Sequence, residues 1–144
     1  MYHSPNMKSG SKCSGGWFEL KTKGKLPDKR SYHSAVVKDG WLFVFGGQDI
    51  KEGLFSDIWK LNLDNFIKYE EKELDDHELD TVTRDKSLEW QLVEQHGGHE
   101  APGKLAHHKA CIHGQCMFVF GGIKESGENN SDVYQFDMNS NKWS

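Results

Sequence analysis

The string FVFGG occurs twice, at Phe43–Gly47 and at Phe118–Gly122, so the second copy begins 75 residues after the first. Residues on both sides of the string match at the same offset. The matching pairs are Pro27 and Pro102, His33 and His108, Ala35 and Ala110, and Asp57 and Asp132. A fixed offset of this kind is the signature of an architecture built from repeated supersecondary units. The sequence therefore predicts two copies of one structural unit.

Each unit contains short runs of β-branched and aromatic residues bounded by turn residues, a pattern typical of β-strands. The turn Lys38-Asp39-Gly40 favours a tight hairpin between two such runs. We expect four antiparallel strands in each unit. They are predicted at 34–38, 41–45, 57–63 and 90–94 in the first unit, and at 110–113, 116–120, 132–138 and from 143 onward in the second. A lone strand is expected at 17–21.

The order of these signals is Pro, His, an apolar run, Gly-Gly, Asp before an aromatic residue, and finally Trp. This order resembles the kelch repeat, the single blade of a kelch β-propeller, over residues 17–143. The resemblance implies an all-β fold, a propeller segment of about two four-stranded blades plus a lone N-terminal strand. It gives structural roles to His33, Gly46, Gly47, Asp57, Trp90, His108, Gly121, Gly122, Asp132 and Trp143.

Two blades alone leave sheet edges and inter-blade faces uncovered. We therefore expect the chain to be a piece of a longer protein, with self-association to complete the propeller as the alternative. The double glycines are expected where backbones approach closely, since a bare Gly-Gly without a following GK or GxxG is a weak phosphate signal. His33 and His108 are expected to form hydrogen bonds between blades rather than to act as catalytic bases.

The first unit is longer than the second because of an acidic insertion at 65–89. It holds nine acidic and four basic residues, a net charge of −5 within a chain of net charge −4. Such composition predicts a solvated loop outside the blade core. The alternatives are a docking segment for a basic partner and a short amphipathic helix. Residues 1–16 are expected to form a flexible N-terminal segment.

Composition excludes several classes of protein. No stretch approaches the ~18 apolar residues of a membrane-spanning helix, and the N-terminal residues lack the apolar core of a secretory signal. The net charge of −4 and a pI near 6.0 give no basic footprint for nucleic acid. Three cysteines cannot all pair within the chain, which favours reduced thiols and a cytoplasmic or nuclear location.

Imidazole and thiol side chains are frequent in the second unit, and both are zinc ligands. They are His96, His99, His107, His108, Cys111, His113 and Cys116. Their spacing matches no usual zinc motif, and Cys111 and Cys116 fall on predicted strands, where we expect them to be buried as small apolar residues. The sequence predicts no metal, no cofactor and no catalytic residues.

The resemblance implies a protein-binding platform, with the kelch substrate receptors and adaptors of cullin-RING ubiquitin ligases most similar in character. A fragment of a kelch-propeller enzyme, of the oxidase or specifier-protein type, is the alternative. Strand alternation places the loops 22–30, 48–55, 94–104 and 123–130 on one face, where a protein or peptide would bind. The candidate contact residues are Arg30, Gln48, Asp49, Lys51, Phe55, Lys104, His107, Lys124, Glu125 and Asn129.

Overall fold

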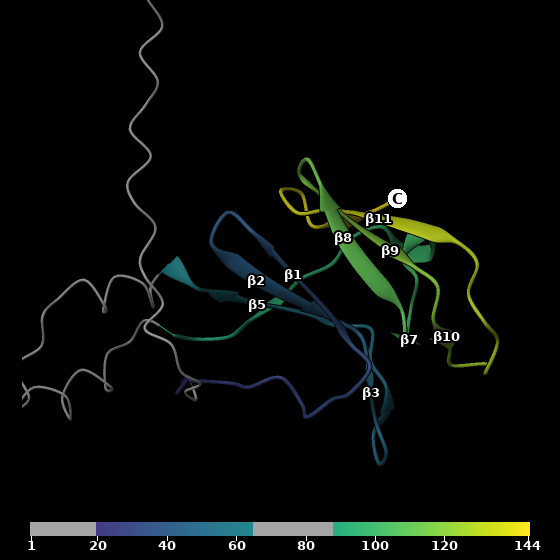
Figure 1. The fold of residues 1–144 in the computed structure, drawn as a ribbon, viewed down its shortest axis with the longest axis horizontal. Helices are drawn as coiled ribbons and strands as arrows, with labels where there is room; N and C mark the ends of the chain where they lie inside the picture. The colour runs from purple at the N-terminus through teal and green to yellow at the C-terminus, as the bar shows by residue number, and fades with distance from the viewer. Residues whose placement is uncertain (1–19, 65–87) are drawn as a thin grey trace, which may run out of the picture.

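The computed structural model describes residues 20–64 and 88–144. They form two neighbouring four-stranded antiparallel sheets, which we call blades (Figure 1). Blade 1 has the strand order β1 (Ser34–Lys38), β2 (Trp41–Phe45), β5 (Ile58–Asn62) and β6 (Gln91–Val93). Blade 2 has the order β8 (Lys109–His113), β9 (Cys116–Phe120), β11 (Val133–Asp137) and β12 (Lys142–Trp143). The prediction of two four-stranded blades is confirmed.

Short elements that the sequence did not predict gather at one end of the blades, as Figure 1 shows near the labels β3, β7 and β10. They comprise a small hairpin of β3 (Gln48–Asp49) and β4 (Gly53–Leu54), a second pair of β7 (Leu105–Ala106) and β10 (Ile123–Lys124), and the 3-10 turn η1 (Gly98–Glu100).

The strand register repeats with the sequence. Phe43 pairs with Lys60 in blade 1, and Phe118 pairs with Gln135 at the equivalent place in blade 2. In blade 1, Lys60 also pairs with Gln91, the residue after Trp90. In blade 2, Trp143 pairs with Phe136, the residue after Gln135. Trp90 and Trp143 therefore occupy equivalent positions in the two blades. The offset of 75 residues therefore describes hydrogen-bonded positions as well as residue types.

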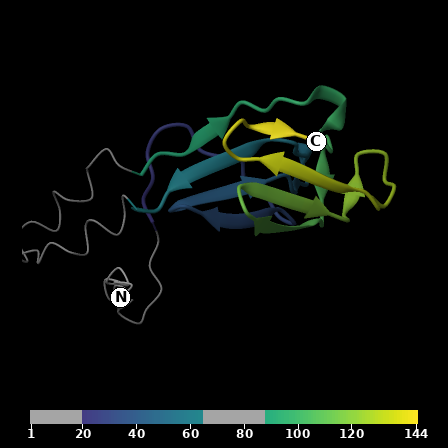
Figure 2. The same ribbon diagram turned by 90° about the horizontal axis from the view of Figure 1, so that it is seen from above.

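The hydrophobic core lies between the blades, which pack face to face (Figure 2). Residues paired across an antiparallel ladder share one face of the sheet, so each blade contributes one row of side chains. Blade 1 contributes Val36, Phe43, Phe45, Ile58 and Val93, and blade 2 contributes Met117, Val119, Phe136 and Trp143. The Trp143 ring is central, with centroids 5.2 Å from Phe45 and 5.0 Å from Phe136.

The opposite face of blade 2 is open in the described part of the chain. Phe120 and Val133 are 57% and 63% exposed, although they stand at the register positions of the buried Phe45 and Ile58. Cys111 is also exposed, at the position equivalent to Val36, and Cys116 is partly buried. The expected burial of these cysteines is therefore wrong for Cys111, because none of the described strands covers its face.

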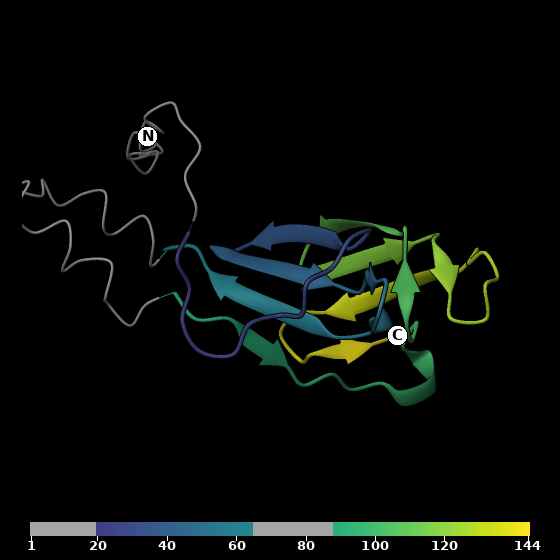
Figure 3. The same ribbon diagram turned by 90° about the horizontal axis from the view of Figure 1, so that it is seen from below.

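Parts of the sequence expectations lie outside the described residues. Residues 1–16, most of the insertion and the first three residues of the expected strand at 17–21 belong to these parts. Leu20 and Lys21 are described and are not in a strand. The segment that follows them runs along blade 1 toward β1 (Figure 3), where the Lys23 N–H donates to the Leu88 carbonyl at 2.9 Å.

Among the described residues, no helix has the length and apolar character needed to cross a bilayer.

The double glycines stand where a side chain would collide with neighbouring backbone. All four have positive φ, which favours glycine. A Cβ on Gly46, Gly47 or Gly122 would lie 2.5–2.7 Å from a backbone oxygen, whereas a Cβ on Gly121 would meet nothing within 4 Å. The close approach predicted from the sequence is thus present at three positions, and Gly121 is open because it lies on the uncovered side of blade 2.

We predict that Gly122→Ala lowers the free energy of unfolding by at least ~2 kcal/mol more than Gly121→Ala. Both substitutions carry the cost of a positive φ, about 1 kcal/mol. Only the first adds a collision, with the carbonyl of Ala106 and the backbone of His108. Denaturant unfolding of both variants measures the difference. Equal losses would show that the backbone approach at Gly122 is not tight.

Candidate functional site

The end of the molecule that carries β3, β4, β7 and β10 is the candidate functional surface, and we call residues 22–33, 48–57, 94–108 and 123–132 the mouth face. Its segments come from both blades and are joined by backbone hydrogen bonds. The Gly47 N–H donates to the Leu105 carbonyl at 2.9 Å, and the Leu105 N–H donates to the Phe55 carbonyl at 3.1 Å. The segment that precedes β8 of blade 2 is therefore hydrogen-bonded to the loop between β2 and β5 of blade 1.

Arg30 is held inside the mouth face by a bidentate ion pair with Asp57. Its two terminal nitrogens lie 2.6 and 3.0 Å from the two carboxylate oxygens, and one also donates to the Gly46 carbonyl at 3.1 Å. The Arg30 side chain is only 5% exposed, and its guanidinium carbon lies 4.3 Å from the centroid of the Phe55 ring. Such paired hydrogen bonds fix planar geometry as well as charge.

The expectation that Arg30 offers its charge to a partner does not agree with this geometry, because that charge is already neutralised. Burial of Asp57 opposes its ionisation, but hydrogen bonds from Arg30 and from the Trp59 indole outweigh burial and hold the pKa of Asp57 below its ordinary value. The indole nitrogen lies 2.6 Å from the Asp57 carboxylate. Arg30 and Asp57 thus brace the loops of blade 1.

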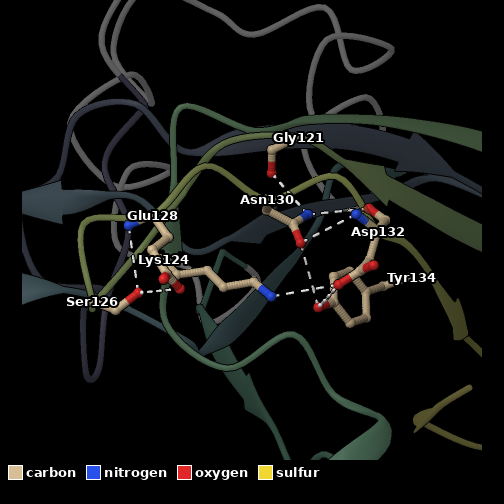
Figure 4. Close-up of polar contacts among 7 residues, drawn as sticks. All are labelled: Gly121, Lys124, Ser126, Glu128, Asn130, Asp132 and Tyr134. Carbon is tan, nitrogen blue, oxygen red and sulfur yellow. Dashed lines mark hydrogen bonds and ion pairs between the residues drawn. The ribbon is translucent and has the colours of Figure 1, made fainter.

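Blade 2 replaces this arrangement with a more open polar network (Figure 4). At the register positions of Arg30, Phe55 and Trp59 it has Leu105, Asn130 and Tyr134.

Asn130, 6% exposed, donates to the Gly121 and Asp132 carbonyls at 3.1 Å each. The carboxylate of Asp132 accepts from the Tyr134 hydroxyl at 3.2 Å and lies 3.4 Å from the Lys124 ammonium, so Lys124 supplies the cation that Leu105 lacks. Contact with the Tyr134 hydroxyl, and then with Asp132, raises the pKa of Lys124.

The structure places the other expected contact residues on the same face. Asp49 is a turn residue, since its carboxylate accepts from the backbone N–H groups of Lys51 and Glu52 at 2.8 and 3.1 Å, and these bonds lower its pKa. Lys104 and Glu125 come from different loops and form an exposed ion pair at 2.7 Å. Among the remaining candidates, Gln48, Phe55 and Lys124 are half-buried, and Lys51, His107 and Asn129 are exposed.

Tyr32 is a mouth-face residue that the sequence reasoning missed. Its ring stacks on the His107 ring, with centroids 3.7 Å apart and planes at 25°. Tyr32 and His107 are themselves 75 residues apart, so the repeat offset contains a signal that could have paired them.

His108 connects the two blades by the side-chain hydrogen bond that the sequence predicted. Its Nε2 lies 2.8 Å from the Ser34 hydroxyl of β1, and the residue is 2% exposed. Burial lowers the pKa of His108 to about 4, against a backbone hydrogen bond at Phe45 that raises it, and the charges of His33, Lys109 and His107 add to the lowering. The equivalent His33 is exposed, since the face of blade 1 beside it meets no preceding blade in the described residues.

The Ser34–His108 pair has the composition of a nucleophile and a base, but its surroundings do not favour catalysis. Both residues are buried, and His108 Nδ1 has no hydrogen-bond partner among the described residues. A catalytic base of this kind is oriented by a third group and reaches substrate from an accessible site. The pair therefore acts as a structural contact.

The imidazole and thiol side chains of the second unit do not converge. Within residues 20–64 and 88–144, no three His, Cys, Asp or Glu side chains are grouped closely enough to hold a metal ion. His99 instead contacts Glu100 at 3.0 Å, and Cys116 lies 3.2 Å from the Gln135 amide.

A recess of about 240 Å³ opens between the blades, lined by mouth-face residues and by Phe45 and Trp143. Gln95 spans it, donating to the Ser56 carbonyl at 3.0 Å and accepting from the Trp143 indole at 2.7 Å. These bonds join the loop of blade 1 to the last strand of blade 2 across the recess.

Comparison with known proteins decides the family. The family model of the KLHDC2/KLHL20/DRC7 Kelch-repeats domain matches residues 11–144. The chain belongs to the kelch-repeat family. Among curated relatives, human leucine-zipper-like transcriptional regulator 1 is 27% identical, over 99% of this chain and 15% of its own length. Human kelch domain-containing protein 3 is 27% identical, over 88% of this chain and 29% of its own length.

An acyl-CoA-binding domain-containing protein of Arabidopsis thaliana is 29% identical, over 92% of this chain and 16% of its own length. The kelch chain therefore spans less than a third of the length of each of these relatives. The solved structure of YjhT matches with a TM-score of 0.53 and 20% identity, over 80% of this chain and 36% of that one, and this likeness shows the fold alone.

We predict that Arg30→Leu lowers the free energy of unfolding by about 2–4 kcal/mol, because it leaves the partly buried Asp57 carboxylate without its cation. Lys124→Leu is the matched control. It removes the cation beside Asp132, whose side chain is 63% exposed, and should cost far less because solvent screens an exposed ion pair. Denaturant unfolding measures both values. Similar losses in the two variants would contradict a structural role specific to Arg30.

Proposed function

We propose that this kelch segment is a protein-interaction module whose mouth face binds a peptide or protein partner. The observation that carries the proposal is the gathering of loops from both units on one end of the blades (Figure 1). These loops differ in sequence between the units, while the strands keep the repeat. Variable loops held by a rigid scaffold are the usual place for binding residues.

The chemistry of the mouth face supports a polar ligand. Lys51 is exposed on the β3–β4 hairpin, and the ion pair of Lys104 with Glu125 is accessible to solvent. Asn129 and Gln48 add amide groups. A rim of charged and amide groups around a few aromatic side chains is typical of protein–protein interfaces. Phe55 is partly covered by Arg30, so another aromatic residue must supply the apolar contact.

The segment is proposed to be the recognition part of a larger adaptor, for which substrate recognition in a ubiquitin ligase is one role that kelch proteins fill. Phe120 and Val133 on the open face of blade 2 support a larger assembly, because their equivalents in blade 1 are buried against the next blade. We infer that a further kelch blade covers this face, from a longer chain or from another copy. A cytoplasmic or nuclear location would suit the exposed thiol of Cys111.

We predict that Lys51→Glu and Lys104→Glu, made separately, each weaken partner binding by more than ~1 kcal/mol, about fivefold, if these residues lie near the interface centre. Peptides selected from a random displayed library against the purified chain serve as the probe, and fluorescence anisotropy measures their affinity. Lys142→Glu, an exposed reversal outside the mouth face, is the control. If Lys142→Glu weakens binding as much as the mouth-face variants, the face is wrongly assigned.

A further inference from the structure

The outer edge of each blade is bridged by a short segment that comes before that blade in the sequence. In blade 2 the outer strand is β12, and residues 94–97, which we call the edge linker, follow β6 and run beside it (Figure 2 and Figure 3). The His96 N–H donates to the Asn141 carbonyl at 2.8 Å, and the Trp143 N–H donates to the His96 carbonyl at 2.9 Å. The edge linker therefore forms a parallel bridge on the side of β12 that faces away from β11.

The outer edge of blade 1 carries the same bridge. The Lys23 N–H donates to the Leu88 carbonyl at 2.9 Å, in a parallel bridge next to the start of β6. The donor stands six residues after Trp17 in the first unit and six after Trp90 in the second, and its acceptor stands two residues before Trp90 and Trp143, respectively. The bridge is thus part of the repeat, although the insertion lengthens the sequence between donor and acceptor in the first unit.

The edge linker of blade 2 lies tightly against β12. Gly97 has a φ of 118°, and a Cβ there would lie 2.8 Å from the Trp143 carbonyl oxygen. A Cβ on the neighbouring Gly98 would meet nothing within 4 Å. The Gln95 side chain adds two bonds, since it donates to the Ser56 carbonyl at 3.0 Å and accepts from the Trp143 indole at 2.7 Å. Backbone and side chain therefore hold the linker on the same strand.

An edge of this kind is exposed to other molecules unless it is covered. An edge strand presents backbone N–H and C=O groups to which a strand of another chain can add. β12 is the edge strand of blade 2 and has only two residues, Lys142 and Trp143, so one bridge covers most of its length. The edge linker occupies the Trp143 N–H that would otherwise be available for pairing.

We propose that the edge linker is a latch that keeps the outer edge of blade 2 closed, and that its release exposes this edge to strand pairing with the same edge of a second copy of the chain. A second copy is the partner because two identical edges satisfy each other by antiparallel pairing about a two-fold axis. The inference goes beyond the proposed function, because none of the latch contacts uses a candidate contact residue of the mouth face.

The open face of blade 2 is the competing surface for self-association. Phe120 and Val133 are exposed on it, and apolar side chains of this kind also bring copies together. That face lies across β8, β9 and β11, whereas the latch covers only the edge at β12. Val133→Lys places a charge on the open face without touching the latch, so it separates the two routes of association.

The experiment compares two latch variants with two controls in the purified chain. Gly97→Ala forces the linker away from β12, and Gln95→Leu removes its side-chain bonds without adding backbone strain. Gly98→Ala changes the next glycine, which also has positive φ but no close neighbour. Gly122→Ala lowers the overall stability at a position that does not contact the latch.

Two measurements are made on every variant. Amide hydrogen exchange gives the rate at Trp143 relative to the rate at Val119 in the central strand β9, a ratio that rises when the edge opens locally and not when the whole chain unfolds. Sedimentation velocity over a range of protein concentrations gives the state of association.

We expect Gly97→Ala and Gln95→Leu to raise the exchange ratio by about tenfold or more and to associate as the concentration increases. The wild-type chain, Gly98→Ala and Gly122→Ala should keep a low ratio and stay monomeric. Adding Val133→Lys to Gly97→Ala should leave the association unchanged.

Four results overturn the latch. The first is a latch variant with a raised ratio that stays monomeric, and the second is association without a raised ratio. The third is association of the wild-type chain or of Gly122→Ala as strong as that of the latch variants. The fourth is loss of association when Val133→Lys is added, which would assign the contact to the open face of blade 2. The proposed function stands or falls separately, with the mouth-face variants.

Discussion

The rest of the structure depends on the close approach of the two blades at their inner edge, where His108 of blade 2 packs against blade 1. A Cβ on Gly46 would lie 2.9 Å from the His108 ring, so only glycine leaves room for it. The ring reaches the Ser34 hydroxyl at 2.8 Å and lies 5.0 Å from the centroid of Phe45. This contact fixes the spacing at which the apolar rows of the blades meet and bury Trp143.

The same approach builds the mouth face. Because His108 fixes the start of β8, the preceding Leu105 is placed within hydrogen-bonding distance of Gly47 and Phe55 in the loop of blade 1. His107 is brought against Tyr32 for the same reason. The stacked rings are thus a consequence of blade packing, although the residue types that form them are not. A scaffold of this kind holds exposed side chains in place without the entropy cost of ordering them.

The sequence predicts the strands well because each is bounded by glycine, by a tight turn or by the Asp before an aromatic residue. β1, β2 and β9 begin and end where those signals stand, and β5 and β11 are one residue shorter at each end than expected. The contact of His108 between the blades was also predictable, since both units carry a histidine at the same distance before the double glycine. These are local patterns, and the repeat doubles each of them.

The contacts of the mouth face were not predictable in the same way. Arg30 and Asp57 lie 27 residues apart in sequence, and nothing local indicates that one buries its charge against the other. Lys124 replaces Arg30 from a different loop, so no register comparison finds it. The exposure of Cys111 depends on what covers blade 2, which its own sequence does not encode. The contacts between side chains of different loops depend on how the blades pack, whereas the positions of the strands follow from local sequence patterns.

The pH dependence of unfolding tests the blade contact most directly. The pKa of His108 falls from 6.5 to about 4 on folding, so its neutral form is favoured in the folded protein. The stability that this shift supports is complete above pH 6.5 and is lost as the pH falls toward 4, by about 2–3 kcal/mol. His108→Gln keeps a hydrogen-bonding group for Ser34 but cannot titrate. In urea unfolding, the free energy of unfolding of the wild-type chain should fall between pH 7 and pH 4 by about 2–3 kcal/mol more than that of His108→Gln. Parallel pH profiles for the two proteins would contradict a His108 buried between the blades.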